Sequence, residues 1–379
     1  MQAVILAAGL GTRLEPVTNT MSKPMIPVAN KPFLQWTVEK LGNFDIIIVV
    51  RKEQKDIIDF FSERVTFVYQ DMPRGTGHAI LQCKDMIDDK FMVINCDEFI
   101  TEEDLKKFSI SEPCTLATFR HPNPERFGVF TIENNIITGV EEKPETPVGN
   151  FVNCGLYMFD KSIFSAIEKT KKSLREEIEI TDAWKSMEPK AFLLSDWETV
   201  VYPWDVLTIN AKILEESGSM IAESAEIRPG AYMEDPVAIG ENAVIGPNCY
   251  IRKYSSIGAN CKVGNAVEVK NSIVMENSFV SHLSYVGDSI VGRNCNVGAG
   301  TLFANLRLDG KNVVMDIKGE KTDSGKRKLG CIIGDNVKFA VNCVVMPGKK
   351  IWPNMLVPPC MMVTSDIREQ PCLHNHRQQ

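Results

Sequence analysis

Apolar residues follow two different periods along the chain, and the period changes near residue 217. Up to that point, short apolar runs typical of buried strands alternate with helical patterns. The runs lie at 3–6, 45–50, 65–69 and 91–95, and helices are predicted at 54–63 and 206–216. Such alternation favours an α/β fold with a Rossmann-like, mostly parallel sheet that binds ligands at the carboxyl ends of its strands.

After residue 217, apolar residues recur at every sixth position. The first frame contains Ile221, Ile227, Met233, Ile239, Ile245, Ile251, Ile257, Val263, Val269 and Met275, a second contains Val291 and Val297, and a third runs through Ile333, Phe339, Val345, Ile351 and Val357. Neither an α-helix nor an ordinary strand keeps this period. It is typical of a left-handed parallel β-helix, whose hexapeptide repeats each place one aliphatic residue inward. We therefore predict domains at 1–217 and 218–365 and a tail at 366–379.

Composition narrows the class of protein. The 379 residues are 44% hydrophobic and 24% charged, with a net charge of −7, which argues against a nucleic-acid partner. No apolar run has the length of a membrane span, and the first residues lack the pattern of a secretory signal. The eleven cysteines have no paired spacing, so we expect buried reduced thiols, as at Cys154, Cys331 and Cys343, and a cytoplasmic location without a membrane partner.

The segment directly after the first predicted strand has the chemistry of a phosphate-binding loop. Small residues allow backbone N–H groups to face phosphate oxygens. They are Ala8, Gly9, Gly11 and Thr12. Arg13 and, ten residues later, Lys23 add positive charge, as a polyphosphate requires. An ordinary strand-to-helix turn is the alternative, and the two cations favour phosphate binding.

Further polar residues of the first half suit nucleotide chemistry. The segment that begins at Gln70 follows a strand, and a Gln amide is able to pair with the edge of a base while Gly75 permits close approach. Asp97, just after another strand, suits Mg²⁺, with a turn or a helix cap as the alternative. Asp205 either supplies a second carboxylate or caps the helix that follows it.

These residues together resemble the sugar-1-phosphate nucleotidylyltransferases. Residues 9–13 and 22–24 match that family's signature, with Ser22 in place of the usual first Pro and Cys96 where Gly often precedes the metal-binding Asp. The resemblance covers residues 1–217. It implies transfer of a nucleotidyl group from UTP or dTTP to glucose 1-phosphate or an N-acetylhexosamine 1-phosphate, with release of pyrophosphate.

The resemblance also implies roles for single residues. Arg13 and Lys23 would contact the triphosphate and act in catalysis, and Asp97 and Asp205 would hold Mg²⁺. The implied nucleotide-binding residues are Ala8, Gly9, Gly11, Thr12, Gln70, Gly75 and Thr76. The implied first sugar site contains Gly128, Glu142 and Asn153, although the polar clusters around Glu142 and Asn153 would equally suit a loop.

One titratable residue interrupts the apolar pattern of the second half. His282 lies in the sequence Ser-His-Leu-Ser-Tyr-Val-Gly-Asp at 281–288, where inward positions are otherwise aliphatic. An imidazole titrates near neutral pH and suits removal of a proton from an attacking amine. A structural histidine at a coil corner is the alternative.

The second half resembles the acetyltransferase domain of the bacterial bifunctional glucosamine-1-phosphate acetyltransferase / N-acetylglucosamine-1-phosphate uridylyltransferases, and still more the archaeal two-headed enzymes. The resemblance implies that acetyl-CoA is the co-substrate and that glucosamine 1-phosphate or galactosamine 1-phosphate is N-acetylated. Besides the base His282, the implied site residues are Arg252 and Lys270 for the sugar phosphate, and Tyr285, Asn296, Ala299 and Asn305 for substrate and acetyl-CoA. A homotrimer is implied because that family builds its cleft between subunits.

The insertion at 306–329 breaks the hexad pattern, so it serves a ligand or a neighbouring subunit. Its basic residues follow the archaeal pattern and are candidates for contact with CoA phosphates: Lys318, Lys321, Lys326, Arg327 and Lys328. Two alternatives are a single-activity nucleotidylyltransferase with a scaffolding β-helix and a non-catalytic regulatory subunit. The polar residues around His282 argue against the first alternative, and Arg13 and Lys23 with the two aspartates argue against the second.

Overall fold

The computed structural model describes residues 1–173 and 176–371, so positions 372–379 of the predicted tail lie outside the described residues. Contacts divide the chain into two compact units. The first contains Met1–Leu10 and Phe33–Thr199, and the second contains Gly11–Pro32 and the chain from Val200 onward. Residues 11–32 thus pack with the second unit although they lie in the first half of the sequence. The domain boundary at 217 remains a proposal.

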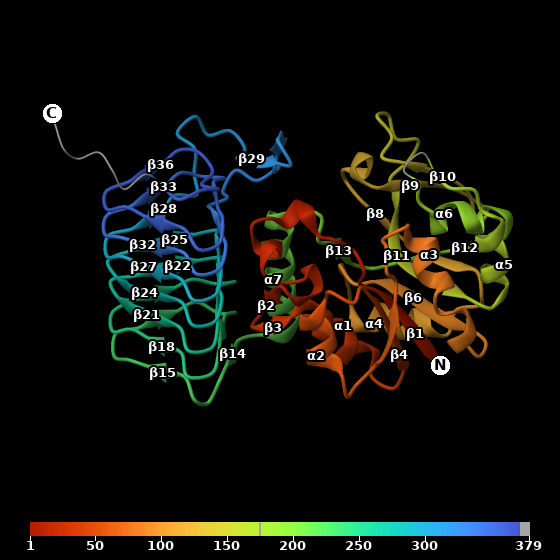
Figure 1. Cartoon of the computed structure of the whole chain (residues 1–379), viewed down its shortest axis with the longest axis horizontal. Coiled ribbons are helices and arrows are strands. Elements are labelled where there is room, and N and C mark those ends of the chain that lie inside the picture. The colour runs from red at the N-terminus through yellow and green to blue at the C-terminus, as the bar shows by residue number, and fades with distance from the viewer. Residues whose placement is uncertain (174–175, 372–379) are drawn as a thin grey trace. The chain divides into compact units, whose positions relative to one another are not determined.

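A mixed sheet forms the centre of the first unit (Figure 1). Its strand order within the described residues is β5-β4-β1-β6-β11-β8-β12-β10-β9. The bounds are β1 Gln2–Leu6, β4 Asp45–Val50, β5 Thr66–Tyr69, β6 Phe91–Asn95, β8 Thr115–Arg120, β9 Gly128–Glu133, β10 Ile136–Glu142, β11 Phe151–Phe159 and β12 Lys190–Leu193. The four strands predicted from apolar runs are confirmed and are mutually parallel. Because β11 runs antiparallel to β6 and β8, the sheet is mixed rather than mostly parallel.

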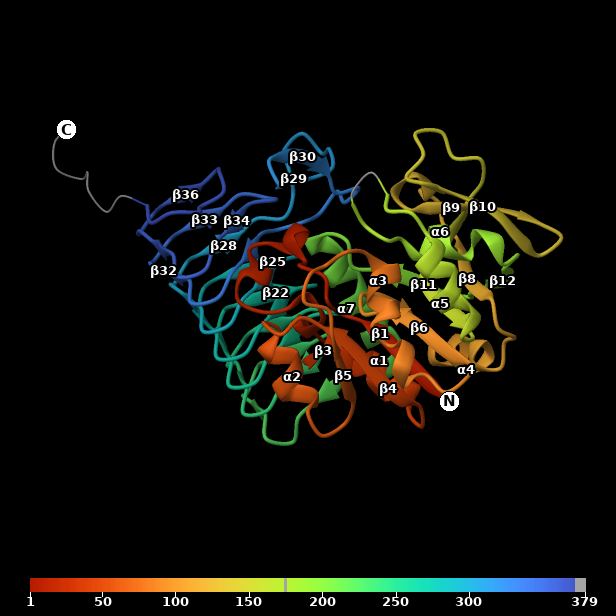
Figure 2. The ribbon, with the colours of Figure 1, turned by 45° about the vertical axis from the view of Figure 1, so that its right-hand side comes forward.

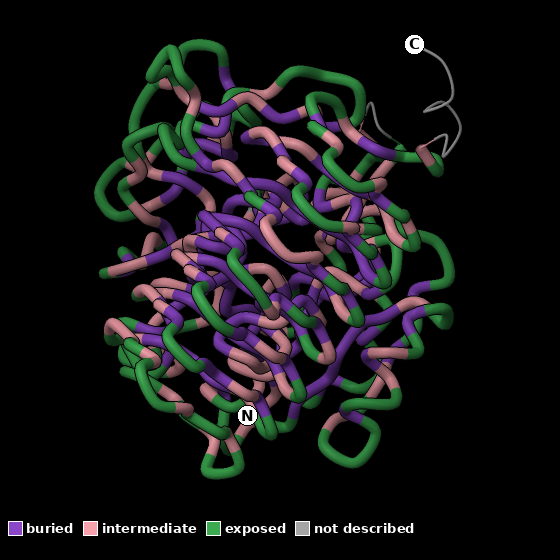
Figure 3. Tube along the Cα trace, turned by 90° about the vertical axis from the view of Figure 1, so that its left-hand side faces the viewer, coloured by how far each residue is buried: buried purple, intermediate pink, exposed green. Residues whose placement is uncertain are grey.

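Helices and short elements complete the first unit. They are α1 Phe33–Leu41, α2 Lys55–Phe61, α3 Thr76–Leu81, α4 Glu102–Ser109, α5 Ser162–Lys169, α6 Ile180–Ala183, the 3-10 turns η4 Lys84–Met86, η5 Pro124–Arg126 and η6 Trp184–Ser186, and the paired strands β7 Glu98–Ile100 and β13 Trp197–Thr199. Local sequence explains α4: the Thr101 side chain accepts an N–H from Asp104 at its start, and Leu105 and Phe108 are buried. In Figure 3, buried stretches lie mainly in the interior of the trace, and the loops that project from it are largely exposed.

The second unit contains the predicted left-handed parallel β-helix, with three parallel sheets among the described residues (Figure 1). Coil sheet 1 consists of β14 Met220–Ile221, β17 Ala238–Ile239, β20 Ser256–Ile257, β23 Ile273–Val274, β26 Ile290–Val291, β31 Ile332–Ile333 and β34 Lys350–Ile351. Coil sheet 2 consists of β15 Glu226–Ile227, β18 Val244–Ile245, β21 Lys262–Asn265, β24 Phe279–His282, β27 Asn296–Val297, β32 Lys338–Phe339 and β35 Leu356–Val357. Coil sheet 3 consists of β16 Tyr232–Met233, β19 Tyr250–Ile251, β22 Glu268–Lys270, β25 Tyr285–Gly287, β28 Leu302–Phe303, β33 Val344–Val345 and β36 Met362–Val363.

The inward residues follow the predicted six-residue spacing, except on two sides of the coil that are one residue short. These two sides are called the five-residue edges. Val274 pairs with Val291 and belongs to the coil core, so the prediction of Met275 as the inward residue was wrong. From Val269 to Val274 and from Val286 to Val291 the chain advances only five positions. Both short edges turn the corner from coil sheet 3 to coil sheet 1. In the next coil, the insertion leaves the β-helix from this same corner.

Segment 11–32 and the last helix of the α/β pattern pack on coil sheet 1. Their elements are η1 Thr12–Leu14, η2 Val17–Asn19, η3 Lys23–Met25, β2 Pro27–Val28, β3 Lys31–Pro32 and α7 Pro203–Ser217, the last confirming the predicted helix. The buried Asn210 side chain joins these parts: its Oδ1 accepts the Ala29 N–H at 2.8 Å and the Ser256 hydroxyl at 2.7 Å. Its Nδ2 donates to the Tyr254 carbonyl at 2.8 Å, so one amide links α7 to segment 11–32 and to the β-helix.

The cysteines of the described ranges are all free thiols, which confirms the prediction for Cys154, Cys331 and Cys343, each of them buried. Burial raises the pKa of the Cys331 thiol to about 12. Within the same ranges, no helix combines the length and the apolar character that a bilayer crossing requires.

Candidate active sites

The loop after β1 is held from behind by hydrogen bonds to its carbonyl groups. The Ala7 carbonyl accepts from Gln54 Nε2 at 2.9 Å, and the Ala8 carbonyl accepts from Arg51 Nε at 3.0 Å. The Ala7 N–H in turn donates to the Val49 carbonyl at 2.9 Å, which extends the pairing of β1 with β4. These contacts hold the peptide planes with which the loop begins.

The following glycines differ in their surroundings. A Cβ at Gly9 would meet no atom within 4 Å, so the backbone there borders open space. Gly11 has a φ of +66°, and a Cβ at this position would lie 2.9 Å from Lys23 Cβ. Gly11 and Lys23 are therefore neighbours, while Arg13 on η1 is exposed. The Thr18 hydroxyl donates to the Gly11 carbonyl at 3.0 Å and supports this arrangement.

The predicted base-binding segment is held mainly by its own chain. Gln70 is buried, with Nε2 3.2 Å from the Gly75 carbonyl and 2.9 Å from His78 Nδ1. Gly75 has a φ of +96°, and a Cβ there would lie 2.5 Å from the Ile178 carbonyl oxygen. The close approach at Gly75 is thus by the backbone at Ile178, which gives this glycine a structural reason of its own. Thr76 begins α3, and its hydroxyl accepts an N–H from Ile180 at 3.2 Å.

The two predicted Mg²⁺ ligands belong to different units. Asp97 follows β6 in the first unit, between Asn95 and Glu98, whose side chains bond to each other at 3.3 Å. Asp205 lies in α7 of the second unit, and its Oδ2 accepts the N–H of Tyr202 at 2.7 Å, so it caps this helix, while its role as a metal ligand stays a prediction. No cluster of three or more His, Cys, Asp or Glu suited to a metal exists among the described residues. Mg²⁺ commonly takes one or two carboxylates plus substrate phosphates, so each aspartate is a suitable type of ligand, and their shared coordination of the ion stays a prediction.

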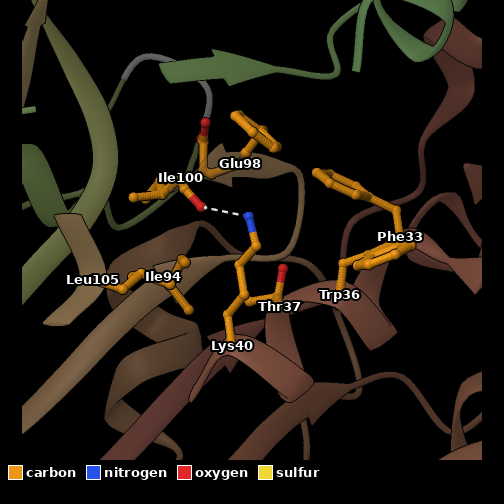
Figure 4. Close-up of a pocket in the computed structure, with 9 residues that line it drawn as sticks. Phe33, Trp36, Thr37, Lys40, Ile94, Glu98, Ile100 and Leu105 are labelled. Carbon is orange, nitrogen blue, oxygen red and sulfur yellow. Dashed lines mark hydrogen bonds between the residues drawn. The ribbon is translucent and has the colours of Figure 1, made fainter. Parts of the chain in front are cut away.

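A small pocket lies beside β7 and is lined by Glu98, Phe99 and Ile100 of that strand (Figure 4). It holds about 10 Å³, which is room for at most one water molecule. The Lys40 ammonium donates to the Ile100 carbonyl at 3.1 Å and lies 4.5 Å from the centre of the Phe99 ring. Trp197 Nε1 donates to Glu98 at 2.9 Å. Such enclosed contacts stabilise the strand, and the pocket is too small for a nucleotide.

The three residues predicted for the first sugar site lie together. Gly128 pairs with Glu142 across β9 and β10, and Val152, next to Asn153, pairs with β9. A Cβ at Gly128 would lie 3.0 Å from Glu142 Oε2 and 3.7 Å from Asn153 Cβ. Asn153 Oδ1 accepts the Tyr157 hydroxyl at 3.1 Å, which orients the amide. The absence of a side chain at Gly128 thus brings a carboxylate and an amide to one place.

In the second unit, predicted site residues gather around a carboxylate that the sequence analysis missed. Asp288 is buried, and its Oδ2 lies 2.7 Å from the Lys270 ammonium. Its Oδ1 accepts from Asn271 Nδ2 at 2.8 Å, and Asn305 Nδ2 donates to Oδ2. Asn305 Nδ2 also donates to the Tyr285 hydroxyl at 3.0 Å. Lys270, Tyr285 and Asn305 are thus joined through Asp288. The sequence signal for this cluster was the break in the six-residue spacing, because Asn271 and Asp288 lie on the two five-residue edges.

Arg252 lies one coil before Lys270, between two carboxylates that the sequence analysis also missed. Its guanidinium is 3.3 Å from Glu268 and 3.7 Å from Glu234. The Tyr250 hydroxyl donates to Glu234. Burial lowers the pKa of Arg252, but the carboxylates outweigh it, so that pKa is raised overall. A guanidinium held in this way is charged and oriented before any ligand binds.

His282, Asn296 and Ala299 lie on other edges of the coil. Val280 and Val286 are the inward residues of this stretch, and His282 is exposed at a corner. The prediction that His282 occupies an inward position was therefore wrong. Within the described chain, no hydrogen bond is formed by the His282 ring, and its role stays a prediction. Asn296 is exposed on coil sheet 2, and Ala299 follows it.

The insertion forms a hairpin, with β29 Val314–Ile317 and β30 Glu320–Asp323, that stands out from the coils in Figure 2. At its base, the Leu329 N–H donates to the Asn305 carbonyl at 2.9 Å. An open cleft in the hairpin is lined by Arg307, Gly310, Lys311, Asn312, Val314, Asp323 and Arg327. Of the predicted cations, Arg327 lines this cleft, and Lys321 lies 3.7 Å from Asp316.

Comparison with known proteins finds a matching family model for each half of the chain. The family model described as nucleotidyl transferase matches residues 2–216, and a model of the GMPPB C-terminal domain matches residues 233–367. A crystal structure from Bacillus anthracis, described as a glucose-1-phosphate thymidylyltransferase in complex with sucrose, is 31% identical with a TM-score of 0.51. It covers 56% of this chain and 94% of its own.

Two archaeal relatives match along nearly the whole chain. Bifunctional protein GlmU of Methanocaldococcus jannaschii is 43% identical, over 97% of this chain and 96% of the relative. The bifunctional sugar-1-phosphate nucleotidylyltransferase/acetyltransferase of Sulfurisphaera tokodaii is 36% identical, over 97% of this chain and 98% of the relative. This full-length similarity favours two activities over a scaffolding β-helix. The chain therefore belongs to the family of bifunctional sugar-1-phosphate nucleotidylyltransferase/acetyltransferases.

Proposed function

We propose that the protein N-acetylates an amino-sugar 1-phosphate with acetyl-CoA and then transfers a nucleotidyl group from UTP or dTTP to the acetylated product. The observation that carries this proposal is the joined cluster of Lys270, Tyr285 and Asn305 around Asp288, because a mere scaffold has no need of it. Glucosamine 1-phosphate and galactosamine 1-phosphate are the candidate acceptors. Glucose 1-phosphate is a further candidate for the nucleotidyl transfer alone.

For acetyl transfer, His282 takes the role of general base. The acceptor amine attacks the thioester carbonyl carbon, His282 removes the amine proton, and the C–S bond breaks. The proton then passes to the leaving sulfur, so free CoA thiol and an N-acetyl sugar phosphate result. Lys270 and Arg252, each already held by carboxylates, orient the acceptor phosphate.

For nucleotidyl transfer, the protein supplies position and charge rather than a nucleophile. A phosphate oxygen of the sugar phosphate attacks the α-phosphorus in line, and pyrophosphate leaves. Arg13 and Lys23 offset negative charge on the phosphate oxygens, while Gln70, Gly75 and Thr76 select the base. Gly128, Glu142 and Asn153 bind the sugar. Mg²⁺, held by Asp97 and Asp205, would add charge neutralisation when bound.

We also propose a homotrimer assembled through the β-helix. Coil sheet 3 carries apolar side chains on its outer face, and Tyr232, Leu302 and Met362 are exposed there. Exposed apolar residues on the same sheet as a polar site suit a surface that another copy covers. The cytoplasm is the proposed location, because acetyl-CoA and nucleoside triphosphates are used and the described cysteines are free.

A screen of purified protein tests these proposals. Each amino-sugar 1-phosphate is mixed with acetyl-CoA and assayed for free thiol, and each sugar 1-phosphate is mixed with UTP or dTTP and Mg²⁺ and assayed for pyrophosphate. We expect thiol with at least one amino sugar and pyrophosphate with its acetylated product. Absence of thiol with every acceptor would reduce the β-helix to a scaffold, and absence of pyrophosphate would overturn the nucleotidyl-transfer half.

A further inference from the structure

The hydrogen bonds around Asp288 have only one consistent set of donors and acceptors. Lys270, Asn271 and Asn305 approach its two oxygens, and each approaching atom is a nitrogen that carries hydrogen. An ionised carboxylate only accepts hydrogen bonds, and the Lys270 ammonium lies 2.7 Å from Asp288 Oδ2. The Asn305 amide must therefore place Nδ2, not Oδ1, toward Asp288.

This orientation decides the role of the Tyr285 hydroxyl. Asn305 Nδ2 has two hydrogens, one directed to Asp288 and one to the Tyr285 oxygen at 3.0 Å. The Tyr285 oxygen accepts in this contact, so its own hydrogen points elsewhere, and within the described chain no side chain or carbonyl receives it. Burial and the charge of Asp288 raise the pKa of Tyr285, so the hydroxyl keeps its proton.

The backbone is also shaped around this contact. A Cβ at Gly287 would lie 2.6 Å from the Tyr285 hydroxyl oxygen and 2.7 Å from Asn305 Nδ2, so a side chain there would displace both groups. The Gly330 N–H donates to the Asp288 carbonyl at 2.8 Å, at the end of the insertion. The base of the hairpin and the two short edges thus hold Asp288, Asn305 and Tyr285 in one arrangement.

We propose that Asp288 is a positioning residue for acetyl transfer: by orienting the Asn305 amide, it makes the Tyr285 hydroxyl a hydrogen-bond donor to an oxygen of the bound amino-sugar phosphate. This inference rests on the proposed acetyl-transfer function. Without the carboxylate, the Asn305 amide is free to turn, and its Oδ1 then competes with substrate for the Tyr285 proton. Asp288 itself is buried and acts through its neighbours.

A double-mutant cycle tests the mechanism. Asp288→Asn and Tyr285→Phe are each expected to raise the KM for the amino-sugar phosphate about tenfold, with a smaller change in kcat. The double variant is expected to show no more than the larger single effect, because both changes remove the same hydrogen bond. Additive effects, or an unchanged KM in Asp288→Asn, would overturn the inference. A wild-type protein without thiol release would instead overturn the proposed function.

A matched carboxylate provides the control. Asp335 is buried at another corner of the β-helix and binds the Arg293 guanidinium at 2.6 Å, so Asp335→Asn also removes a buried ion pair. It is expected to leave the KM for the amino sugar unchanged in wild-type and Tyr285→Phe backgrounds. Pyrophosphate release and the size of the assembly report whether each variant is folded. If Asp288→Asn does not fold, Gly287→Ala replaces it in the same cycle, with the same expected result and the same contradicting one.

Discussion

The residues proposed for acetyl transfer lie on a repeating coil, whereas those proposed for nucleotidyl transfer lie on loops between unlike elements. In the β-helix, Arg252 and Lys270 occupy equivalent positions one coil apart, and Glu268 pairs with Tyr285 in register. In the first half, the phosphate-loop residues, Gln70 and Asp97 follow separate strands, and Lys23 belongs to a segment that packs with the other unit. A coil aligns residues by sequence spacing alone, while a loop site depends on contacts between distant segments.

The difference extends to how the side chains are held. Lys270 and Arg252 are already bound by carboxylates. Arg13, by contrast, is exposed on a short 3-10 turn. We infer that the coil site is organised before substrate binds and that the loop site is completed by the triphosphate and Mg²⁺.

The largest expected effect comes from replacing the proposed general base, which should remove one activity and leave the other. His282→Ala should lower the rate of thiol release about 100- to 10,000-fold, because the attacking amine then has no base. Pyrophosphate release from an already acetylated sugar phosphate should stay at the wild-type rate. Both rates are measured on one preparation, and a variant with full thiol release would show that another group accepts the proton.

The reciprocal substitution replaces a residue proposed for nucleotidyl transfer. Lys23→Ala should lower pyrophosphate release about 100- to 1,000-fold, since one cation no longer offsets charge on the phosphate oxygens. Thiol release should be unaffected, and the unfolding transition should show an intact fold. Equal loss of both activities would indicate damage to the second unit, with which Lys23 packs, rather than a role in catalysis.

A matched pair of core substitutions compares how each unit contributes to the free energy of unfolding. Phe303 in the coil and Phe130 in the mixed sheet are both fully buried, 5.2 Å from Phe339 and 5.7 Å from Trp184 between ring centres. Each change to Ala should lower the free energy of unfolding by about 3–5 kcal/mol. Phe303→Ala should impair thiol release first, because Asn305 follows on the same segment. Denaturant titration with both assays checks this, and parallel loss of the two activities would contradict independent units.

The smallest expected effect concerns the corners of the coil at which the backbone has a positive φ. Asn260 has a φ of +56° and its amide donates to Asn277 one coil later at 3.1 Å. Asn260→Ala should cost about 1 kcal/mol more than Asn260→Gly, because only Ala pays a steric penalty at this φ. Thermal unfolding of the two variants measures the difference, and equal stabilities would mean that a Cβ carries no steric penalty at this corner, since both variants lose the same amide contact.

Much of the architecture was readable from local patterns. The hexad period predicted the β-helix, and apolar runs predicted the parallel strands β1, β4, β5 and β6. The prediction of a mostly parallel sheet was incomplete, because β11 pairs antiparallel with β6 and β8, and β10 pairs antiparallel with β9 and β12. The frame error at Met275 had a local cause: a five-residue edge brings Val274 inward.

Periodicity and short motifs are local properties, so the fold classes, the family resemblance and most candidate site residues were predictable from the chain alone. Three findings required the folded molecule: segment 11–32 packs with the second unit, Gly128, Glu142 and Asn153 lie together, and Asp288 joins Lys270 to Asn305. The physical reason is that a buried carboxylate is defined by its partners, which coil stacking brings together from positions about 17 residues apart in the chain.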